Sequence, residues 1–278
     1  MVSRSRRLHP ERIRRTLGAA RCVRERARFV VNELRDTPTV GQYRLRGSGL
    51  LALVRHPLLD MWGLEEVFRF RAYEPPRALA GALASLPRPL RILDLGGHAG
   101  YFGLFILGLF PDCRITSFEP DPDNARILRR CVAANAFGDR WQVIEAAGAT
   151  SDGTAEFCSS FHLSRVAHSP DPYLQELQRR LGGVFPFLRG TALLGAEGLL
   201  VQCRDVLPLL GDADLIKLDI EGGEWEILGD PRFREAGVGA IVLEYHPAYG
   251  PGEDAEATVA RALTGAGLER TAPVRGAD

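Results

Sequence analysis

Lysine is nearly absent from this sequence: among its 35 Lys and Arg residues, only residue 217 is a lysine. Asp and Glu also number 35, so the formal net charge is zero. A balanced charge gives no general attraction to nucleic acid or to an anionic membrane surface. We therefore expect no nucleic-acid partner, and Lys217 needs a specific reason in a chain that otherwise uses Arg.

Paired cysteines and long apolar runs are lacking as well. The five cysteines include no C-x-x-C pair, so they predict reduced thiols in a cytoplasmic protein rather than a zinc site or disulfide framework. The longest apolar run, residues 101–110, contains two glycines and is far shorter than the ~20 residues that span a bilayer. No apolar stretch follows the early arginines, so we expect no signal peptide and no transmembrane segment. The sequence leaves open whether the protein forms a homodimer.

The N-terminal segment has its own charge pattern. Residues 1–36 hold 11 Arg against four acidic residues. Apolar residues recur among the arginines, which predicts one helix over residues 8–35 and an Arg-rich helical extension over residues 1–38. This extension is either a solvated amphipathic helix docked on the main domain or an arm for an anionic partner.

The rest of the chain alternates short apolar strands with helices. Residues 39–89 form a lead-in with a hairpin (42–45 and 50–54) and two helices (64–73 and 77–86). Residues 90–278 form the main domain, with strands at 90–95, 114–118, 141–145, 215–220 and 240–245 and helices at 101–109, 123–135, 223–228 and 253–266. This alternation predicts an α/β fold with a doubly wound, mostly parallel sheet that binds ligands at the carboxyl ends of its strands.

A long interruption separates the third and fourth strands of this sheet. Residues 154–158 and 199–203 are expected to pair as an inserted ribbon, with a substrate loop or lid over residues 159–198 and a helix near residues 171–181. His162, Arg165 and His168 lie close together in this loop. They are candidates for binding an acidic or hydroxylated acceptor, or they are scattered surface polar residues.

A glycine turn follows the first strand of the main domain. It reads Asp94-Leu95-Gly96-Gly97-His98-Ala99-Gly100-Tyr101. The dinucleotide pattern G-x-G-x-x-G fails here, whereas the S-adenosylmethionine pattern of an acid, one residue, Gly, three residues and Gly fits Asp94, Gly96 and Gly100. Glycine lets the backbone turn tightly, and the helix that begins at Tyr101 offers free N–H groups. His98 either adds an imidazole near the cofactor or points away.

An acid at the end of the second strand supports the same cofactor. Glu119, with Pro120 after it, lies 25 residues beyond Asp94, where a carboxylate can accept hydrogen bonds from both ribose hydroxyls. Ala147, just after the third strand, and Asp219 complete the predicted cofactor set.

The acids at the ends of the fourth and fifth strands are the catalytic candidates. Methyl transfer to a hydroxyl requires an aligned acceptor and removal of its proton. Lys217 and Asp219 share one face of the fourth strand, and Glu221 would share it if the strand continued. Lys217 is either a counter-ion for Asp219, Glu119 or Glu244, or it acts on the substrate. The catalytic candidates are Lys217, Asp219, Glu221, Glu244 and His246, with His246 as a plausible general base.

Two more residues are candidates for the acceptor side, and a metal is not expected. Glu224, one turn beyond Glu221, can reach back to the same site, and Tyr73 can form a wall of the acceptor pocket. The aspartates lack the close spacing of a metal-binding loop, so no metal ligand is assigned.

The ordered motifs resemble those of the FkbM family of S-adenosylmethionine-dependent methyltransferases. The resemblance runs from about residue 40 to about residue 250 and includes ILDLGGHAGYF, SFEPDPDNARIL, DLIKLDIEGGEWEIL and AIVLEYHP. It implies a class I methyltransferase (Rossmann-like) fold and, as a rule, metal-independent O-methylation of sugar or natural-product hydroxyls or of carboxylates. Asp94, Gly96, Gly100 and Glu119 match the family's cofactor motif, and residues 219–222 match its active-site signature. Gly97-His98 stands where the family has Ala-Asn.

These features lead to one leading hypothesis and two alternatives. The leading one is an S-adenosylmethionine-dependent O-methyltransferase that acts on a hydroxyl or carboxyl of a small molecule in secondary metabolism or on a sugar unit. The alternatives are an N-methyltransferase of an amine or peptide, and a cofactor-binding partner protein without turnover.

Overall fold

The computed structural model describes residues 10–35, 37–57, 60–159, 164–166, 199–252 and 254–271. Its centre is a five-stranded parallel sheet in the order β11-β10-β3-β4-β5. The strands are β3 (Arg91–Leu95), β4 (Arg114–Phe118), β5 (Trp141–Ile144), β10 (Leu215–Leu218) and β11 (Ile241–Leu243). The predicted doubly wound parallel sheet is confirmed, and its strand order is Rossmann-like.

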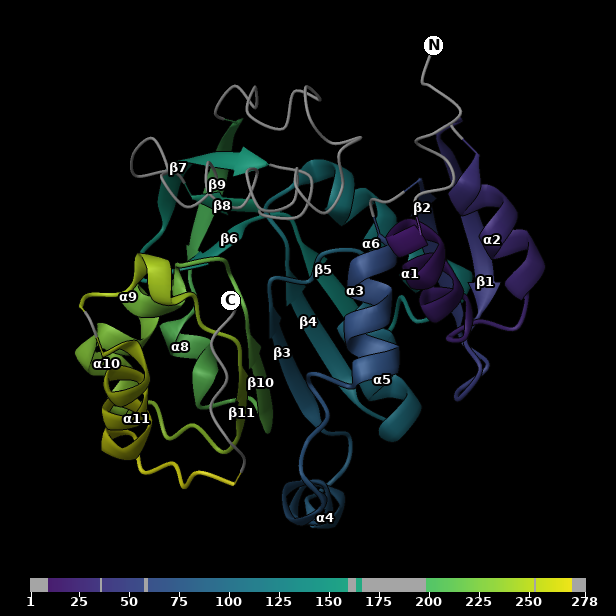
Figure 1. Ribbon diagram of the computed structural model, residues 1–278. Coiled ribbons are helices and arrows are strands. Elements are labelled where there is room, and N and C mark those ends of the chain that lie inside the picture. The colour runs from purple at the N-terminus through teal and green to yellow at the C-terminus, as the bar shows by residue number, and fades with distance from the viewer. Residues whose placement is uncertain are drawn as a thin grey trace.

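Helices cover both faces of this sheet (Figure 1). The helices α3, α5 and α6 lie on one side, and α8 to α11 lie on the other. Their bounds are α3 (Met61–Glu65), α5 (Tyr101–Leu109), α6 (Pro122–Ala134), α8 (Leu207–Leu210), α9 (Glu224–Gly229), α10 (Pro231–Glu235) and α11 (Ala255–Gly265). Each side encloses its own apolar core, so β10 is buried at all four positions, and Lys217 is its single polar residue.

Local sequence signals place the helix ends close to the predicted bounds. Helix α6 begins at Pro122, after Asp121, whose side chain accepts hydrogen bonds from the backbone N–H groups of Asp123 and Asn124. Helix α5 begins after Gly100, which has a φ of 86°. The 3-10 turn η4 (Pro247–Tyr249) follows β11.

The N-terminal extension differs from the prediction of one helix. Residues 10–34 form two helices, α1 (Pro10–Ala20) and α2 (Arg26–Leu34). Between them, Val23 pairs with Leu45 of the hairpin, and the Arg24 N–H donates to the Arg44 carbonyl at 2.8 Å. The hairpin therefore takes backbone groups that a continuous helix would need, and the helix breaks there.

The predicted hairpin is confirmed as β1 (Thr39–Arg44) and β2 (Leu51–His56). It is joined to α2 by a buried chain of polar groups. His56 lies between Glu33, at 2.6 Å from its Nδ1, and the Tyr43 hydroxyl, at 2.9 Å from its Nε2. All three side chains are buried, so the second helix of the extension is docked on the hairpin.

The lead-in between hairpin and sheet contains a change of helix type. Helix α3 continues directly into a π-helical turn, η2 (Glu66–Phe70), and this turn ends at Arg71, whose φ is 54°. A second helix, α4 (Arg77–Ser85), follows as predicted. The wider π turn interrupts the regular helix just before Tyr73, and such turns are common near functional sites.

The inserted ribbon is part of a separate four-stranded sheet. Its order is β6-β9-β7-β8, with β6 (Ala147–Ala149), β7 (Gly153–Ser159), β8 (Ser164–Val166) and β9 (Leu199–Asp205). The antiparallel pairing of β7 with β9 confirms the predicted ribbon, whereas β6 and β8 were not predicted. The predicted helix near residues 171–181 lies outside the described residues. Within the described ranges, no helix combines the length and apolar character needed to cross a bilayer.

Candidate functional site

A row of polar side chains crosses three neighbouring strands of the parallel sheet. Register pairs Asp94 of β3 with Lys217 of β10 on one side and with Ser117 of β4 on the other. All three are buried among apolar neighbours. Ser117 donates to Asp94 Oδ2 at 2.7 Å and accepts from the indole N–H of Trp141 at 2.9 Å. The row fixes the Asp94 carboxyl group at the carboxyl end of β3.

Lys217 joins the fourth strand to the glycine turn. Its ammonium donates to the Gly96 carbonyl at 2.7 Å and lies 2.9 Å from Asp219 Oδ2. Burial alone would lower the pKa of Lys217, but Asp219 and Asp94 outweigh it and raise this pKa to about 12. The lysine is therefore a buried cation, and of its predicted partners Asp219 is confirmed.

The glycine turn is tightly packed against its surroundings. The N–H groups of Gly96 and Gly97 both donate to the Phe118 carbonyl at the end of β4, at 3.0 and 2.9 Å. Gly96 has a φ of 86°, and a Cβ atom there would lie 1.9 Å from the Asp219 carbonyl oxygen. Only glycine fits this position, both for its backbone angle and for the space beside it.

Glu119 lies beside this turn as predicted. Its Oε2 accepts from the His98 backbone N–H at 2.6 Å, and its Oε1 accepts from the Asp121 N–H at 2.9 Å. Burial raises the pKa of Glu119 to about 7, although these two backbone N–H groups act in the opposite direction. Glu119 thus titrates near neutral pH.

The hairpin contributes residues to this turn that the sequence did not predict. Arg55 of β2 forms a 2.6 Å ion pair with the fully buried Asp60, and it donates to Asn124 Oδ1 at 2.7 Å. Its guanidinium also lies 3.5 Å from His98 Nε2. The His98 side chain is 43% exposed, and the His98 backbone has a φ of 46°. It therefore faces the hairpin side of the turn, and Arg55 connects the lead-in to the cofactor motif.

Acidic residues converge on the Tyr73 hydroxyl from distant parts of the chain. This hydroxyl lies 2.9 Å from Asp219 Oδ2 and 2.5 Å from Glu244 Oε2. One hydroxyl carries one proton, so it satisfies only one of the two carboxylates, and the other must hold a proton of its own to share the contact. Burial and the charge of Asp219 raise the pKa of Glu244 to about 7.

A further acid, Glu66 of the π turn, belongs to the same group and was not predicted. Burial, Glu244 and Asp219 raise its pKa to about 8. Asp219 differs: burial would raise its pKa, but Lys217 and His246 hold it below the ordinary value. Asp219 is therefore the permanently ionised member of this group.

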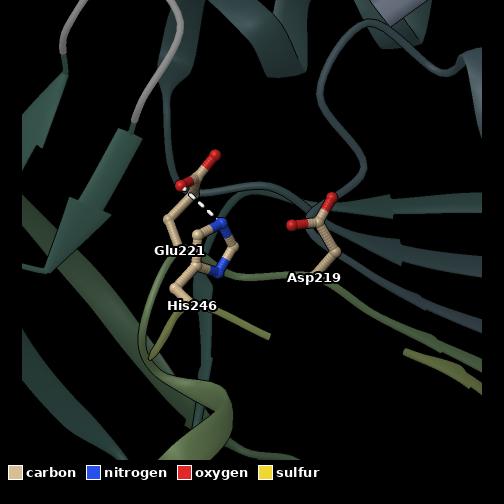
Figure 2. A group of neighbouring side chains, drawn as sticks. All are labelled: Asp219, Glu221 and His246. Carbon is tan, nitrogen blue, oxygen red and sulfur yellow. Dashed lines mark ion pairs between the residues drawn. The ribbon is translucent and has the colours of Figure 1, made fainter. Parts of the chain in front are cut away.

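The second part of the acidic group contains Glu221 and His246 (Figure 2). His246 Nε2 lies 3.0 Å from Glu221 Oε2, and Nδ1 lies 2.9 Å from Glu224 Oε1. The Nε2 contact is a close ion pair rather than an aligned hydrogen bond, because Glu221 Oε2 has no hydrogen-bond partner among the described residues. Burial opposes the charged imidazole, but the two carboxylates raise the pKa of His246 to about 12. In this state His246 is a cation and has no free nitrogen for a general base.

The backbone at Glu221 explains how it reaches His246. Strand β10 ends at Leu218, and Glu221 sits in the following turn with a φ of 56°. The condition that the strand continue to Glu221 is therefore not met, and the turn rather than the strand directs its side chain. Burial raises the pKa of Glu221, while His246 acts in the opposite direction.

Three predicted site residues have different surroundings from those expected. Glu224 is fully buried, and its oxygens accept from the N–H groups of Gly222 and His246, so it is not available to an acceptor. The Tyr101 hydroxyl donates to the Leu53 carbonyl at 2.8 Å and anchors α5 to the hairpin. Ala147 packs in the small core of the second sheet.

The three candidates in the long loop are not tested by these contacts. His162 and His168 lie outside the described residues. Arg165 lies in β8, where its backbone pairs with Cys158. Pro120 sits between Glu119 and Asp121 at the end of β4, as predicted.

Comparison with known proteins finds methyltransferases. The chain is 30% identical over 139 residues to the tRNA1(Val) (adenine(37)-N6)-methyltransferase of Aeromonas hydrophila, covering 50% of this chain and 56% of that protein. It is 34% identical over 85 residues to the O-methyltransferase imqG of Aspergillus flavus, covering 31% and 33%. It is 25% identical over 178 residues to the methyltransferase sdnD of Sordaria araneosa, covering 59% and 66%. The chain thus spans less than two thirds of the length of each relative.

No family model matches the chain. Among solved structures, it is similar to the O-methyltransferase of a trans-AT PKS multienzyme of Brevibacillus brevis in complex with S-adenosyl-L-homocysteine. That likeness has a TM-score of 0.33 and 14% identity and covers 72% of this chain and 50% of the other. A TM-score this low supports no argument, so the fold assignment rests on the sheet order and helix layers described above.

Proposed function

We propose that this protein is an S-adenosylmethionine-dependent methyltransferase, and that it transfers the methyl group to an oxygen atom of a small molecule, a natural product or a sugar unit. The observation that carries the proposal is the glycine turn after β3, held between Lys217 of β10 and Glu119, which directly follows β4. The partial similarity to methyltransferases and the resemblance to the FkbM family support it.

The residues present fit this cofactor. Asp94 is completely buried, and its Oδ1 has no hydrogen-bond partner among the described residues, so it can accept from a donor of a bound ligand. Glu119 at the end of the neighbouring strand is placed to accept from ribose hydroxyls. Asp94, the backbone of residues 96–100, and Glu119 would therefore hold the cofactor, and Asp219 would lie at its methionine side.

The cofactor, when bound, supplies a methyl carbon on a positively charged sulfur. The chain must then orient an acceptor oxygen toward that carbon and take up the proton that the oxygen loses. Asp219 is committed to Lys217 and Tyr73, whereas Glu244 shares only the Tyr73 hydroxyl. We assign Glu244 as the proton acceptor in its ionised form, which prevails above its pKa of about 7, and Tyr73 as the group that orients it.

Two measurements test the proposal directly. Calorimetry of the full chain with S-adenosylmethionine is expected to show one saturable site, and no binding at millimolar cofactor would refute it. Transfer of a labelled methyl group to a panel of hydroxyl, carboxyl and amine acceptors separates the two reaction types. The match to an adenine-N6-methyltransferase makes N-methylation the second candidate, and methylated amines without methylated hydroxyls would favour it.

We expect cofactor affinity to depend on pH through Glu119. With a pKa of about 7, Glu119 is mostly neutral at pH 6 and mostly ionised at pH 8. Because the carboxylate accepts from two hydroxyls better than the acid does, the affinity for S-adenosylmethionine should rise about tenfold over this range. Calorimetry from pH 6 to 8 measures this rise.

The Glu119→Gln variant is the matched control for that pH dependence. It keeps the shape but cannot ionise, so its affinity should be lower and lack the rise that Glu119 causes. Titration of the cofactor's own amino group affects both proteins equally and cancels in the comparison. Parallel profiles in the two proteins would show that Glu119 does not bind the cofactor as a carboxylate.

Tyr73→Phe is expected to separate catalysis from cofactor binding. Removing the hydroxyl leaves Asp219 paired with Lys217, but Glu244 loses the group that orients it. We expect kcat to fall about 10- to 100-fold, which is less than the ~10²- to 10⁴-fold of general acid–base assistance because Glu244 itself remains. The Kd for S-adenosylmethionine should stay within about twofold, because no tyrosine contact to the glycine turn is lost.

Tyr43→Phe is the control for this change. It removes another buried hydroxyl with two polar partners, His56 and Asn32, in the hairpin rather than at the site. It should lower the unfolding temperature without lowering kcat. Equal losses of kcat in both variants would assign the effect of Tyr73 to stability alone.

A further inference from the structure

Three side chains from separate parts of the chain bring metal-binding atoms together. Asp219 follows β10, Glu221 lies in the turn beyond it, and His246 follows β11. One ligand atom from each residue lies within 4.8 Å of the other two. Figure 2 shows the Asp219 carboxylate facing the space beside Glu221 and His246. Their sequence spacing did not predict this arrangement, because His246 comes from a different strand.

Each of these side chains keeps binding capacity toward the shared space. Lys217 and Tyr73 both contact Oδ2 of Asp219, and among the described residues Oδ1 has no hydrogen-bond partner. Glu221 Oε2 is a buried atom without an aligned hydrogen bond in the same part of the structure. A buried carboxylate oxygen in this condition, such as Glu221 Oε2, favours a cationic ligand.

A carboxylate outside this group fixes the imidazole from behind. Glu224 is fully buried and accepts from His246 at both the backbone N–H, at 2.7 Å, and Nδ1, at 2.9 Å. The ring is thus locked with Nε2 toward Glu221. A carboxylate on the far nitrogen is the arrangement that orients histidines bound to metal ions in proteins.

The separation between Glu221 and His246 suits an octahedral ion. With bonds of about 2.1 Å, neighbouring donor atoms around Mg²⁺ or a similar ion are about 3 Å apart. Glu221 Oε2 and His246 Nε2 are 3.0 Å apart. Two carboxylates with one imidazole are donors that suit Mn²⁺, Fe²⁺ or Zn²⁺.

We propose that Asp219, Glu221 and His246 together bind a divalent cation, which holds an oxygen atom of the methyl acceptor next to the cofactor. The second part of this inference rests on the proposed function, whereas the metal site itself does not. In the metal-free chain, His246 Nε2 lies 3.0 Å from Glu221 Oε2, and binding of the cation would release the proton of the imidazole. The remaining coordination positions would be open to water or to the acceptor.

Binding of Mn²⁺ alone tests the site. Mn²⁺ is titrated at pH 8 into the full chain without cofactor, and free Mn²⁺ is followed by electron paramagnetic resonance. We expect one saturable site per chain. Glu221→Gln and His246→Gln should each raise the Mn²⁺ dissociation constant at least about tenfold. Glu235→Gln, an exposed acid on α10, should leave it unchanged.

A second measurement needs no variant and guards against misfolding. Pulsed electron paramagnetic resonance of Mn²⁺ bound to the unmodified chain should show coupling to one imidazole nitrogen. His246 is the only nitrogen ligand in the proposed set. Lack of saturable binding at millimolar Mn²⁺, or bound Mn²⁺ without nitrogen coupling, would overturn the proposal. Unchanged Mn²⁺ affinity in both folded variants would do the same.

The outcome is distinguishable from that of the proposed function. S-adenosylmethionine is titrated separately in the presence of a chelator. Cofactor binding without a Mn²⁺ site would refute the proposed metal site and leave the methyltransferase proposal in place. A Mn²⁺ site with the predicted ligands but without cofactor binding would support the proposed metal site and refute the proposed methyltransferase function.

Discussion

Replacing Lys217 with Met is expected to lower the free energy of unfolding by about 3–5 kcal/mol, the usual effect of removing one partner of a buried ion pair. The Lys217 side chain is 4% exposed, and its ammonium pairs with Asp219 and donates to the Gly96 carbonyl. Without it, the partly buried Asp219 and the fully buried Asp94 have no cation between them. We also expect S-adenosylmethionine binding to be lost, because the glycine turn loses its anchor. Urea unfolding and calorimetry measure the two effects.

Lys217→Arg distinguishes charge from shape. The ammonium has four oxygens within 3.5 Å: those of the Leu95, Gly96 and Asp219 carbonyls and of the Asp219 carboxylate. A compact ammonium meets oxygens grouped around one point, whereas a planar guanidinium does not. We therefore expect Arg to fail as a replacement. Full cofactor binding by the Arg variant would show that position 217 needs only a positive charge.

A surface arginine provides the control for Lys217. Arg126 pairs with Asp123 on α6, and its side chain is 68% exposed. Arg126→Met should change the free energy of unfolding by less than about 0.5 kcal/mol, because exposed pairs contribute little. A similar loss in both variants would mean that burial of Lys217 does not matter.

Gly96→Ala is expected to have the second large effect. A side chain at a φ of 86° costs about 1–2 kcal/mol by itself. The added Cβ would also lie 1.9 Å from the Asp219 carbonyl oxygen, a backbone atom that cannot move without shifting the end of β10. We expect a loss of more than about 2 kcal/mol in the free energy of unfolding and at least a tenfold weaker affinity for S-adenosylmethionine.

Gly81→Ala makes the same chemical change where the structure has room. Gly81 lies in α4, and a Cβ there meets nothing within 4 Å. In a helix this change should stabilise the fold by about 0.5–1 kcal/mol. The two substitutions are thus expected to have opposite signs. Wild-type cofactor affinity in Gly96→Ala would contradict the assignment of the turn as the cofactor site.

The main-domain elements were predictable because their signals are local. The bounds of β4 and α5 coincide with those predicted, since a short apolar strand and an apolar helix after Gly100 are each visible within ten residues. The prediction of one N-terminal helix was wrong because the signal that breaks the helix is not local. Its period is continuous, but pairing of Val23 with the hairpin, 22 positions away, breaks it.

The residues of the candidate site also divide into those with a local sequence signal and those without one. Asp94, Gly96 and Glu119 follow from turn chemistry and strand ends. Neither Glu66 nor Arg55 stands out in the sequence. Glu66 is one acid on a helix, and Arg55 lies in an apolar strand of a chain that contains many arginines. A buried charge at either position depends on what packs against it, which no local pattern contains.

By itself, the sequence determined the parallel sheet, the glycine turn and the carboxylate beside it, because strand period and glycine geometry are properties of neighbouring residues. Only the tertiary structure decided which acids meet. Tyr73 reaches Asp219 and Glu244, and a left-handed backbone turns Glu221 toward His246. These contacts depend on strand register and on the paths of the connecting loops, so residues far apart in the chain form one charged group around Lys217.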